Sequence, residues 1–89
     1  MTWQVRIEDK SRRELRALDP HVQQQIKKYL RLRLETDEDP RRFGKALTNN
    51  KSGLWRYRVG DYRIICEIKD SILMVLALRI AHRREVYED

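Results

Sequence analysis

The chain has 89 residues, of which 40% are hydrophobic and 38% are charged, and its formal net charge is +6. A chain of this length has room for one small core, so we expect a single domain over residues 1–89. It contains no run of ~18 apolar residues, which excludes a transmembrane helix.

Two further features bear on the compartment. The first ten residues lack the basic-then-apolar layout of a signal peptide. The single cysteine, Cys66, excludes an internal disulfide framework and suits a reducing environment. Because Cys66 lies in an apolar run, we interpret it as a small core residue. We therefore expect a cytoplasmic protein.

The positive charge is concentrated in the middle of the sequence. Residues 41–69 contain eight lysines and arginines but only two acidic residues, Asp61 and Glu67, so this segment alone accounts for the net charge of +6. A local field of this sign attracts polyanions, and nucleic acid is the first candidate. The alternative is a charged face that serves only to keep the protein in solution.

The N-terminal segment is expected to form a strand followed by a short helix. Apolar side chains alternate along residues 2–8, which predicts a half-buried strand. Ser11 and Glu14 have the spacing of a capping box, and leucines follow them. The spacing predicts a short amphipathic helix over roughly residues 10–18.

A second helix is expected directly after the first. Asp19 has the side chain of an N-cap and Pro20 suits the first helical position. Apolar residues then recur at steps of three and four to about Leu34, so the two helices should form a helical hairpin. Residues 36–53 are interpreted as a loop with a short turn around residues 43–47.

The C-terminal half is expected to form three sequential strands. Residues 54–59 and 62–68 flank Gly60-Asp61, which is a two-residue hairpin signal, and residues 72–80 are almost wholly apolar. The predicted order is therefore β-α-α-β-β-β. This is an α+β fold in which the helical hairpin packs on one face of a four-stranded, mainly antiparallel sheet and leaves the other face uncovered.

Three arginines occupy one face of the predicted hairpin. With Gly60-Asp61 as the turn, Arg58 lies opposite Arg63 and Arg56 lies opposite Ile65, so the three guanidiniums point the same way. Like charges directly across a ladder are unfavourable, and a local conflict of this kind is expected mainly at functional sites. Glu67 can pair with one of them but not with all three. Converging guanidinium forks suit phosphate, including a phosphate that gains charge under attack.

The element order and two motifs resemble a known family. The run G-x-W-R-x-R-x-G-D-Y-R (residues 53–63) and the terminal H-R-R-E-V-Y (residues 82–87) are similar to the RelE/ParE toxin superfamily, with the RelE/StbE branch as the closer match. The resemblance covers nearly the whole chain. It implies the toxin of a type II toxin–antitoxin system, a RelE-like fold and a ribosome-dependent endonuclease that cuts messenger RNA in the ribosomal A site.

The resemblance also implies a set of site residues. In RelE-type enzymes, basic residues before the hairpin turn, an arginine after it and a tyrosine near the C-terminus form the site. The matching catalytic residues here, with two additions from the tail, are Arg56, Arg58, Arg63, His82, Arg83 and Tyr87. The arginines would stabilise the phosphate while the RNA 2′-hydroxyl attacks it, and Tyr87 would stack on a base. The basic residues expected to bind RNA are Arg41, Arg42, Lys45 and Lys51.

The sequence departs from the family pattern at two points. Arg58 stands where some members have a lysine, and a guanidinium does not give up its proton. The family's arginine in the last strand aligns near Ala81, and Arg79 and Arg83 are candidate substitutes. We therefore expect His82, which can exchange a proton near neutral pH, to act as general acid or base.

Two other functions compete with the nuclease. One is a ParE-type inhibitor of DNA gyrase without nuclease activity, and the other is a nucleic-acid-binding module or an inactive toxin that acts as a co-repressor. Expected partners are a RelB-like antitoxin with an acidic segment, the ribosome with messenger RNA in its A site, and ribosomal RNA. We expect no metal or other cofactor, because no cluster of His, Cys, Asp and Glu has metal-ligand spacing.

Overall fold

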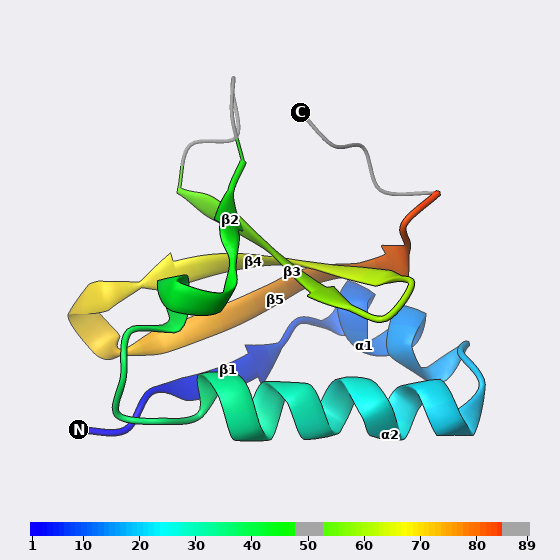
Figure 1. The fold of residues 1–89 in the computed structure, drawn as a ribbon, viewed down its shortest axis with the longest axis horizontal. Helices are drawn as coiled ribbons and strands as arrows, with labels where there is room; N and C mark the ends of the chain where they lie inside the picture. The colour runs from blue at the N-terminus through cyan, green and yellow to red at the C-terminus, as the bar shows by residue number, and fades with distance from the viewer. Residues whose placement is uncertain (48–52, 85–89) are drawn as a thin grey trace.

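A computed structural model of the protein describes residues 1–47 and 53–84 (Figure 1). The sheet has the strand order β1-β5-β4-β3-β2, with helices α1 and α2 preceding its last four strands in the chain. The expected α+β architecture is confirmed, but the sheet has five strands instead of four. The added strand, β2 (Lys45–Ala46), pairs antiparallel with β3, so an extended segment stands where a short turn was predicted. None of the helices in the described part of the chain is long and apolar enough to cross a membrane.

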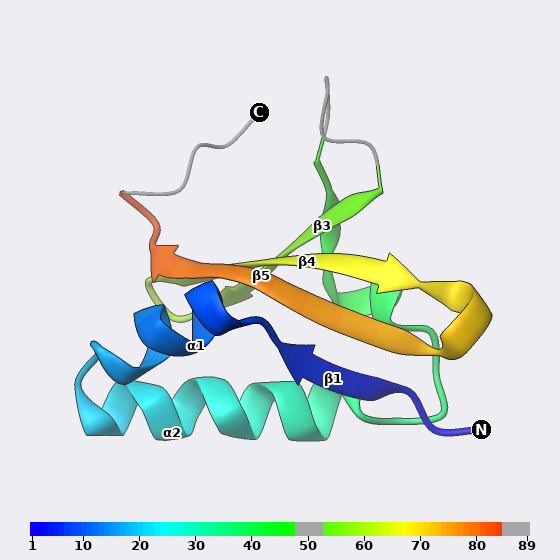
Figure 2. The same cartoon turned by 180° about the vertical axis from the view of Figure 1, so that it is seen from behind.

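The first strand joins the sheet at one edge. Strand β1 (Gln4–Ile7) runs parallel to β5 (Met74–His82), and the remaining neighbours in the sheet are antiparallel. Helix α1 (Asp9–Arg16) follows at once and lies against the later part of β5, as Figure 2 shows from behind. The prediction of a mainly antiparallel sheet is therefore confirmed.

Ser11 and Glu14 do not form the capping box that their spacing predicted. Helix α1 begins at Asp9, so both residues lie inside it. The Ser11 hydroxyl donates to the carbonyl oxygen of Ala77 at 2.7 Å, and the Glu14 carboxylate accepts from the backbone N–H of Ile80 at 2.8 Å. The first bond falls where β1 ends, since Ala77 is paired with Ile7, and the second lies beyond that end. Helix α1 therefore closes an edge of the sheet where no strand continues.

Helix α2 (Pro20–Tyr29) begins where the sequence predicted. The Asp19 carboxylate accepts from the backbone N–H of His21 at 2.9 Å, and proline occupies the first turn. The helix continues into a π-helical turn over Leu30–Leu34, so helical backbone extends to the predicted end. Together these turns cover one face of the sheet (Figure 1).

The β3–β4 hairpin has the predicted register. Strands β3 (Leu54–Val59) and β4 (Tyr62–Lys69) are joined at Gly60-Asp61, and Val59 is paired with Tyr62. Gly60 has φ of 58°, a left-handed conformation that suits glycine at this turn.

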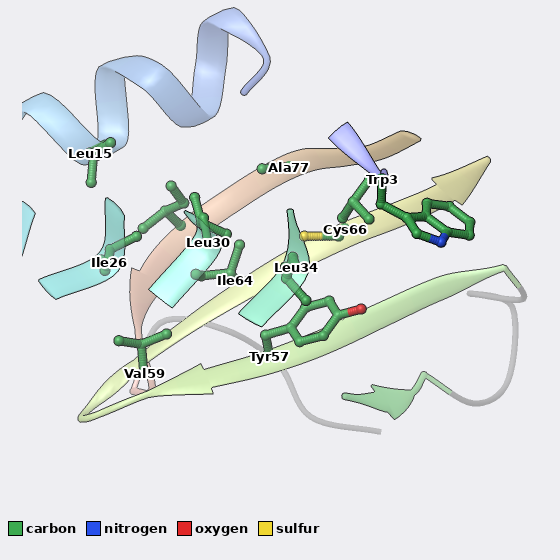
Figure 3. Close-up of a cluster of buried hydrophobic side chains, with 12 residues drawn as sticks. Trp3, Leu15, Ile26, Leu30, Leu34, Tyr57, Val59, Ile64, Cys66 and Ala77 are labelled. Carbon is green, nitrogen blue, oxygen red and sulfur yellow. The ribbon is translucent and has the colours of Figure 1, made fainter. Parts of the chain in front are cut away.

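The main core lies between α2 and the sheet, as the close-up in Figure 3 shows. Tyr57 and Cys66 are fully buried in it, and Trp55 packs against its edge. Burial raises the pKa of the Cys66 thiol well above its ordinary value. Cys66 is therefore a protonated core residue, which confirms its interpretation from the sequence.

The opposite face of the sheet is only partly uncovered. Leu47, Ile65 and Ala81 form a second buried cluster there, with Leu54 packed against it. The backbone N–H of Leu47 donates to the carbonyl oxygen of Leu54 at 3.0 Å. Leu47 and Leu54 thus cover part of this face, and the three hairpin arginines lie on it beside them.

Candidate functional site

The three hairpin arginines share the face opposite the helices. Arg58 is paired with Arg63 across the ladder, and Arg56 is paired with Ile65. Tyr57 lies between the two β3 arginines in sequence and points into the core, which sends its neighbours the other way. This part of the sequence prediction is confirmed.

A fourth basic side chain comes from the strand that the sequence did not predict. Lys45 in β2 is paired with Arg56. A cavity of about 310 Å³ opens between these elements, and its lining residues are Phe43, Gly44, Lys45, Arg56, Arg58 and Arg63. None of these six lining residues is acidic. We call this cavity the basic pocket.

Arg63 is the most enclosed member of the basic pocket. Only 7% of its surface is exposed, and Arg58 and Ala81 are its neighbours on the adjacent strands. Water screens charges weakly in such a position, so the guanidinium interacts strongly with any ion that enters. Guanidiniums and an ammonium that converge on one cavity are suited to phosphate oxygens.

Close packing at Gly44 brings the segment that carries Phe43 and Lys45 against the hairpin. A Cβ atom at Gly44 would lie 2.9 Å from Cε1 of Tyr57 and 3.2 Å from the carbonyl oxygen of Arg56. The Tyr57 hydroxyl in turn donates to the carbonyl oxygen of Pro40 at 2.8 Å. Only a glycine allows the chain to pass this close, and Lys45 next to it reaches the pocket for this reason.

The structure does not bring His82 to the basic pocket. His82 is paired with Tyr62, so it shares the helix-covered face, and its ring makes an edge contact with Tyr62 at 5.4 Å between centroids. Its Nδ1 accepts from the backbone N–H of Arg84 at 3.2 Å. His82 therefore lies on the face opposite Arg58 and Arg63, and its proton exchange stays a prediction.

The residue of β5 that lies beside Arg63 is Ala81, which has no functional group. Of its two predicted substitutes, Arg79 donates from Nε to the Glu14 carboxylate at 3.0 Å and is held towards α1. Arg83 is exposed, and its backbone N–H donates to the carbonyl oxygen of Asp61 in the hairpin turn. Neither lines the basic pocket.

The four predicted RNA-binding residues divide into different groups. Lys45 lines the basic pocket, whereas Lys51, like the predicted catalytic residue Tyr87, lies outside the described residues. Arg41 makes two hydrogen bonds to Asp70, at 3.0 and 2.5 Å, and they lower the pKa of that carboxyl. The Arg41 guanidinium therefore already forms ion pairs with acidic side chains of the same chain.

Arg42 is engaged in a similar way on the neighbouring turn. It forms an ion pair with Glu38, four residues earlier, and its guanidinium lies 4.4 Å from the ring centroid of Phe43. Phe43 is the one functional candidate that sequence reasoning missed. The available signal was a single phenylalanine inside a basic run, Arg41 to Lys45, that was interpreted as loop.

Within the described residues, no group of three or more His, Cys, Asp or Glu side chains is arranged to hold a metal ion. The lining residues of the pocket offer the chemistry of cations and hydrogen-bond donors: binding an anion, stabilising charge that develops on it, and, at Lys45, transferring a proton.

The sequence is similar to a described protein family and to a characterised toxin. Residues 5–87 match the family described as the ParE toxin of the type II toxin–antitoxin system parDE. The chain is 31% identical over 87 residues to toxin RelG of Mycobacterium tuberculosis (strain ATCC 25618 / H37Rv), with 98% of each chain covered.

Two solved structures have a similar fold. The toxin–antitoxin complex RelBE2 of Mycobacterium tuberculosis contains a chain that superposes with a TM-score of 0.85 at 29% identity, covering 96% of this chain and 95% of that one. The archaeal RelE–RelB complex of Pyrococcus horikoshii gives a TM-score of 0.72 at 23% identity, covering 97% and 100%.

Proposed function

This chain belongs to the RelE/ParE superfamily, the toxins of type II toxin–antitoxin systems, and we propose that it is a ribosome-dependent endonuclease that cuts messenger RNA in the ribosomal A site. The observation that carries the proposal is the basic pocket, in which Arg56, Arg58, Arg63 and Lys45 converge on one cavity. Converging cations of this kind can stabilise the charge that develops on a phosphate during phosphoryl transfer.

The proposed reaction uses the RNA's own 2′-hydroxyl as the nucleophile. Its oxygen releases its proton to water and forms a bond to the adjacent phosphorus, while the bond from phosphorus to the 5′-oxygen of the next nucleotide breaks. The products are a 2′,3′-cyclic phosphate and a 5′-hydroxyl. The phosphate oxygens gain charge as the reaction proceeds, and the guanidiniums of Arg58 and Arg63 stabilise that charge.

Lys45 supplies what the guanidiniums lack. An ammonium can transfer a proton, and a guanidinium retains its protons in proteins. Because Lys45 lies beside Arg56 in the ladder, its amine is next to the phosphate that the arginines would hold. We propose that Lys45, in place of His82, delivers the proton to the departing 5′-oxygen. Tyr87 and Lys51 remain proposed contacts to the message.

The partners follow from this activity and from charge. We propose that an acidic segment of a cognate antitoxin covers the basic pocket, because a net charge of +6 concentrated in residues 41–69 attracts it. A segment of that kind orders only on binding. When the antitoxin is absent, the same surface would bind ribosomal RNA, with Arg83 as an exposed contact beside the hairpin turn. The proposed substrate places the protein in the cytoplasm.

A second candidate is inhibition of DNA gyrase, and one observation favours it: the family that residues 5–87 match is described by its ParE toxin. In this case the pocket would be a binding surface for an anionic partner and no RNA bond would break. Gyrase supercoiling assays with the purified protein test this candidate directly.

The deciding experiment is an RNA cleavage assay. Ribosomes are stalled on a defined message with an empty A site, the purified toxin is added, and RNA ends are mapped. We expect one cut in the A-site codon, a 2′,3′-cyclic phosphate, and no cut without ribosomes.

Two double variants with the same loss of charge make the assay specific. Arg58→Ala with Arg63→Ala should reduce the cleavage rate by at least about 10²–10³-fold, the usual cost of removing one donor that stabilises the transition state. Arg13→Ala with Arg31→Ala removes two exposed arginines outside the pocket and should cleave normally. Equal rates for the two variants would contradict the proposed site, and intact message with wild-type protein would contradict the nuclease.

A further inference from the structure

Phe43 is an aromatic ring left partly exposed at the mouth of the basic pocket. It ends a 3₁₀ turn, Pro40–Phe43, and 37% of its surface is accessible to solvent. It is the only phenylalanine in the chain, and it lines the pocket together with Lys45 and Arg58. A partly exposed aromatic ring beside four cations is a surface that a ligand with a planar ring can contact.

Two guanidiniums lie against this ring. The Cζ atom of Arg42 is 4.4 Å from the ring centroid, and that of Arg33, from the π-helical turn, is 5.0 Å away. Both distances are in the range of cation–π contacts. The ion pair from Arg42 to Glu38 holds the nearer guanidinium in place. Planar groups of these two kinds are the ones on which proteins stack nucleobases.

The backbone that carries Phe43 is held on both sides. The Asp39 carboxylate accepts from the backbone N–H of Arg41 at 3.0 Å, which caps the turn. The Tyr57 hydroxyl donates to the carbonyl oxygen of Pro40, and Gly44 packs directly on the Tyr57 ring. The position of the ring relative to the arginines is therefore built into the fold, and a ligand would meet a preformed surface.

We propose that Phe43, with the Arg42 guanidinium over its ring, is a stacking platform that takes one nucleobase of single-stranded RNA while an adjacent phosphate occupies the basic pocket. The inference rests on the proposed function, since it assigns a base subsite to the same site. Every base has a π-face, so the platform accepts any of the four bases and acts as a positioning surface. It would hold the message so that the reacting phosphate lies among Lys45, Arg58 and Arg63.

The test measures binding of a short, unpaired, fluorescein-labelled RNA by fluorescence anisotropy at low salt, without ribosomes. Phe43→Ala should weaken binding about 5- to 150-fold, the usual cost of removing one stacking side chain. Phe43→Tyr keeps the ring and should bind as wild type does. Ile72→Ala removes another exposed apolar side chain, 58% accessible and not among the residues of the pocket, and should have no effect.

A second set of RNAs separates stacking from folding. Each RNA has one base removed at a successive position, with the backbone intact. The wild-type protein should lose affinity at one position, and Phe43→Ala should be insensitive to that same removal, because the ring and the base act as a pair. Melting temperatures are measured in parallel, and Phe43→Leu, which keeps most of the volume without the ring, replaces the alanine variant if that variant is unfolded.

The outcomes are distinct. If Phe43→Ala binds as tightly as wild type while Arg58→Ala binds weakly, the stacking platform is wrong and the proposed function stands. If the effects of Phe43→Ala and of each base removal simply add, the ring does not contact a base and the platform is again wrong. If wild-type protein binds no single-stranded RNA at low salt, the platform is wrong, and the proposed function is then decided separately by the cleavage assay with stalled ribosomes.

Discussion

The two faces of the β3–β4 hairpin are built from alternating residues of the same strands and have opposite properties. Towards the helices the hairpin presents Tyr57 and Ile64, both with no exposed surface, and away from them it presents Arg58 and Arg63. Apolar burial on the first face supplies stability. The second face brings like charges together, which opposes stability.

This comparison shows how a small domain can carry a costly site. Because side chains alternate along a strand, the arginines take their positions from a backbone that the core on the other face already holds. Substitutions on the helix-covered face should therefore change stability and leave RNA affinity intact. Substitutions on the arginine face should lower RNA affinity and leave stability nearly unchanged. The following predictions test this separation.

The largest expected effect is in the core that packs against the helix-covered face, at the end of the π-helical turn. Leu34 has no exposed surface, and Leu34→Ala should lower the free energy of unfolding by about 2–5 kcal/mol, because it removes apolar contacts and leaves a cavity. Leu32, two residues earlier, is 55% exposed, so Leu32→Ala should change stability by less than about 0.5 kcal/mol. Urea denaturation measures both. A loss of RNA affinity in folded Leu34→Ala protein would break the separation between the two faces.

Gly44→Ala should affect both faces, because Gly44 contacts the core on one side and the basic pocket on the other. The new Cβ would lie 2.9 Å from Cε1 of the buried Tyr57 ring, so one of them must move. We expect a loss of about 1–3 kcal/mol in stability together with weaker RNA binding, as Lys45 shifts.

The partner variant is Tyr57→Leu, which removes the ring atoms that the new methyl group meets. The cost of Gly44→Ala measured in that background should be smaller than in the wild type, because the two residues are in contact. Equal costs would show that the close approach of Gly44 to Tyr57 does not constrain the chain.

A smaller effect concerns the salt dependence of RNA binding. Each phosphate contact to a single strand contributes about 0.7 to the slope of log affinity against log salt concentration, so Arg58→Gln should reduce the slope by about that amount. Arg31→Gln has the same loss of charge at an exposed position outside the basic pocket and should leave the slope unchanged. The same reduction in both variants would mean that RNA responds to overall charge and not to the pocket.

The smallest effect is a decline in stability at alkaline pH. Burial raises the pKa of the Cys66 thiol, so the thiol stays protonated in the native state above its ordinary pKa of 9.0 while it ionises in the unfolded chain. The unfolded state then binds fewer protons, and the free energy of unfolding falls as pH rises above about 9. Cys66→Ala should show a shallower fall between about pH 9 and pH 10 in urea denaturation. An unchanged slope would assign the decline to other groups, with Tyr57 the first candidate because burial also raises its pKa.

Much of the fold could be predicted because its signals are local. Gly60-Asp61 sets the hairpin register, and this register alone places Arg56, Arg58 and Arg63 on one face. Asp19 and Pro20 likewise determine where α2 begins. Signals of this kind act between residues only a few positions apart, so they can be recognised in the sequence.

The misjudged residues depend on contacts between distant segments. Ser11 and Glu14 have the spacing of a helix cap, but the edge of β5, more than sixty positions away, takes their hydrogen bonds. Residues 45–46 have no strand pattern of their own and become a strand because β3 lies beside them. His82 was predicted to act beside the arginines because it can exchange a proton near neutral pH, but the register of β5 against β4 directs it to the other face.

The sequence by itself determined the element order, the hairpin register and the presence of three arginines on one face, since turn chemistry and alternation act over a few residues. Only the tertiary structure decided that Lys45 and Phe43 complete the pocket and that His82 does not. These assignments depend on which strand lies beside β3 and on how closely Gly44 approaches Tyr57. Such contacts form only when the whole sheet is assembled, because each joins residues that no local pattern connects.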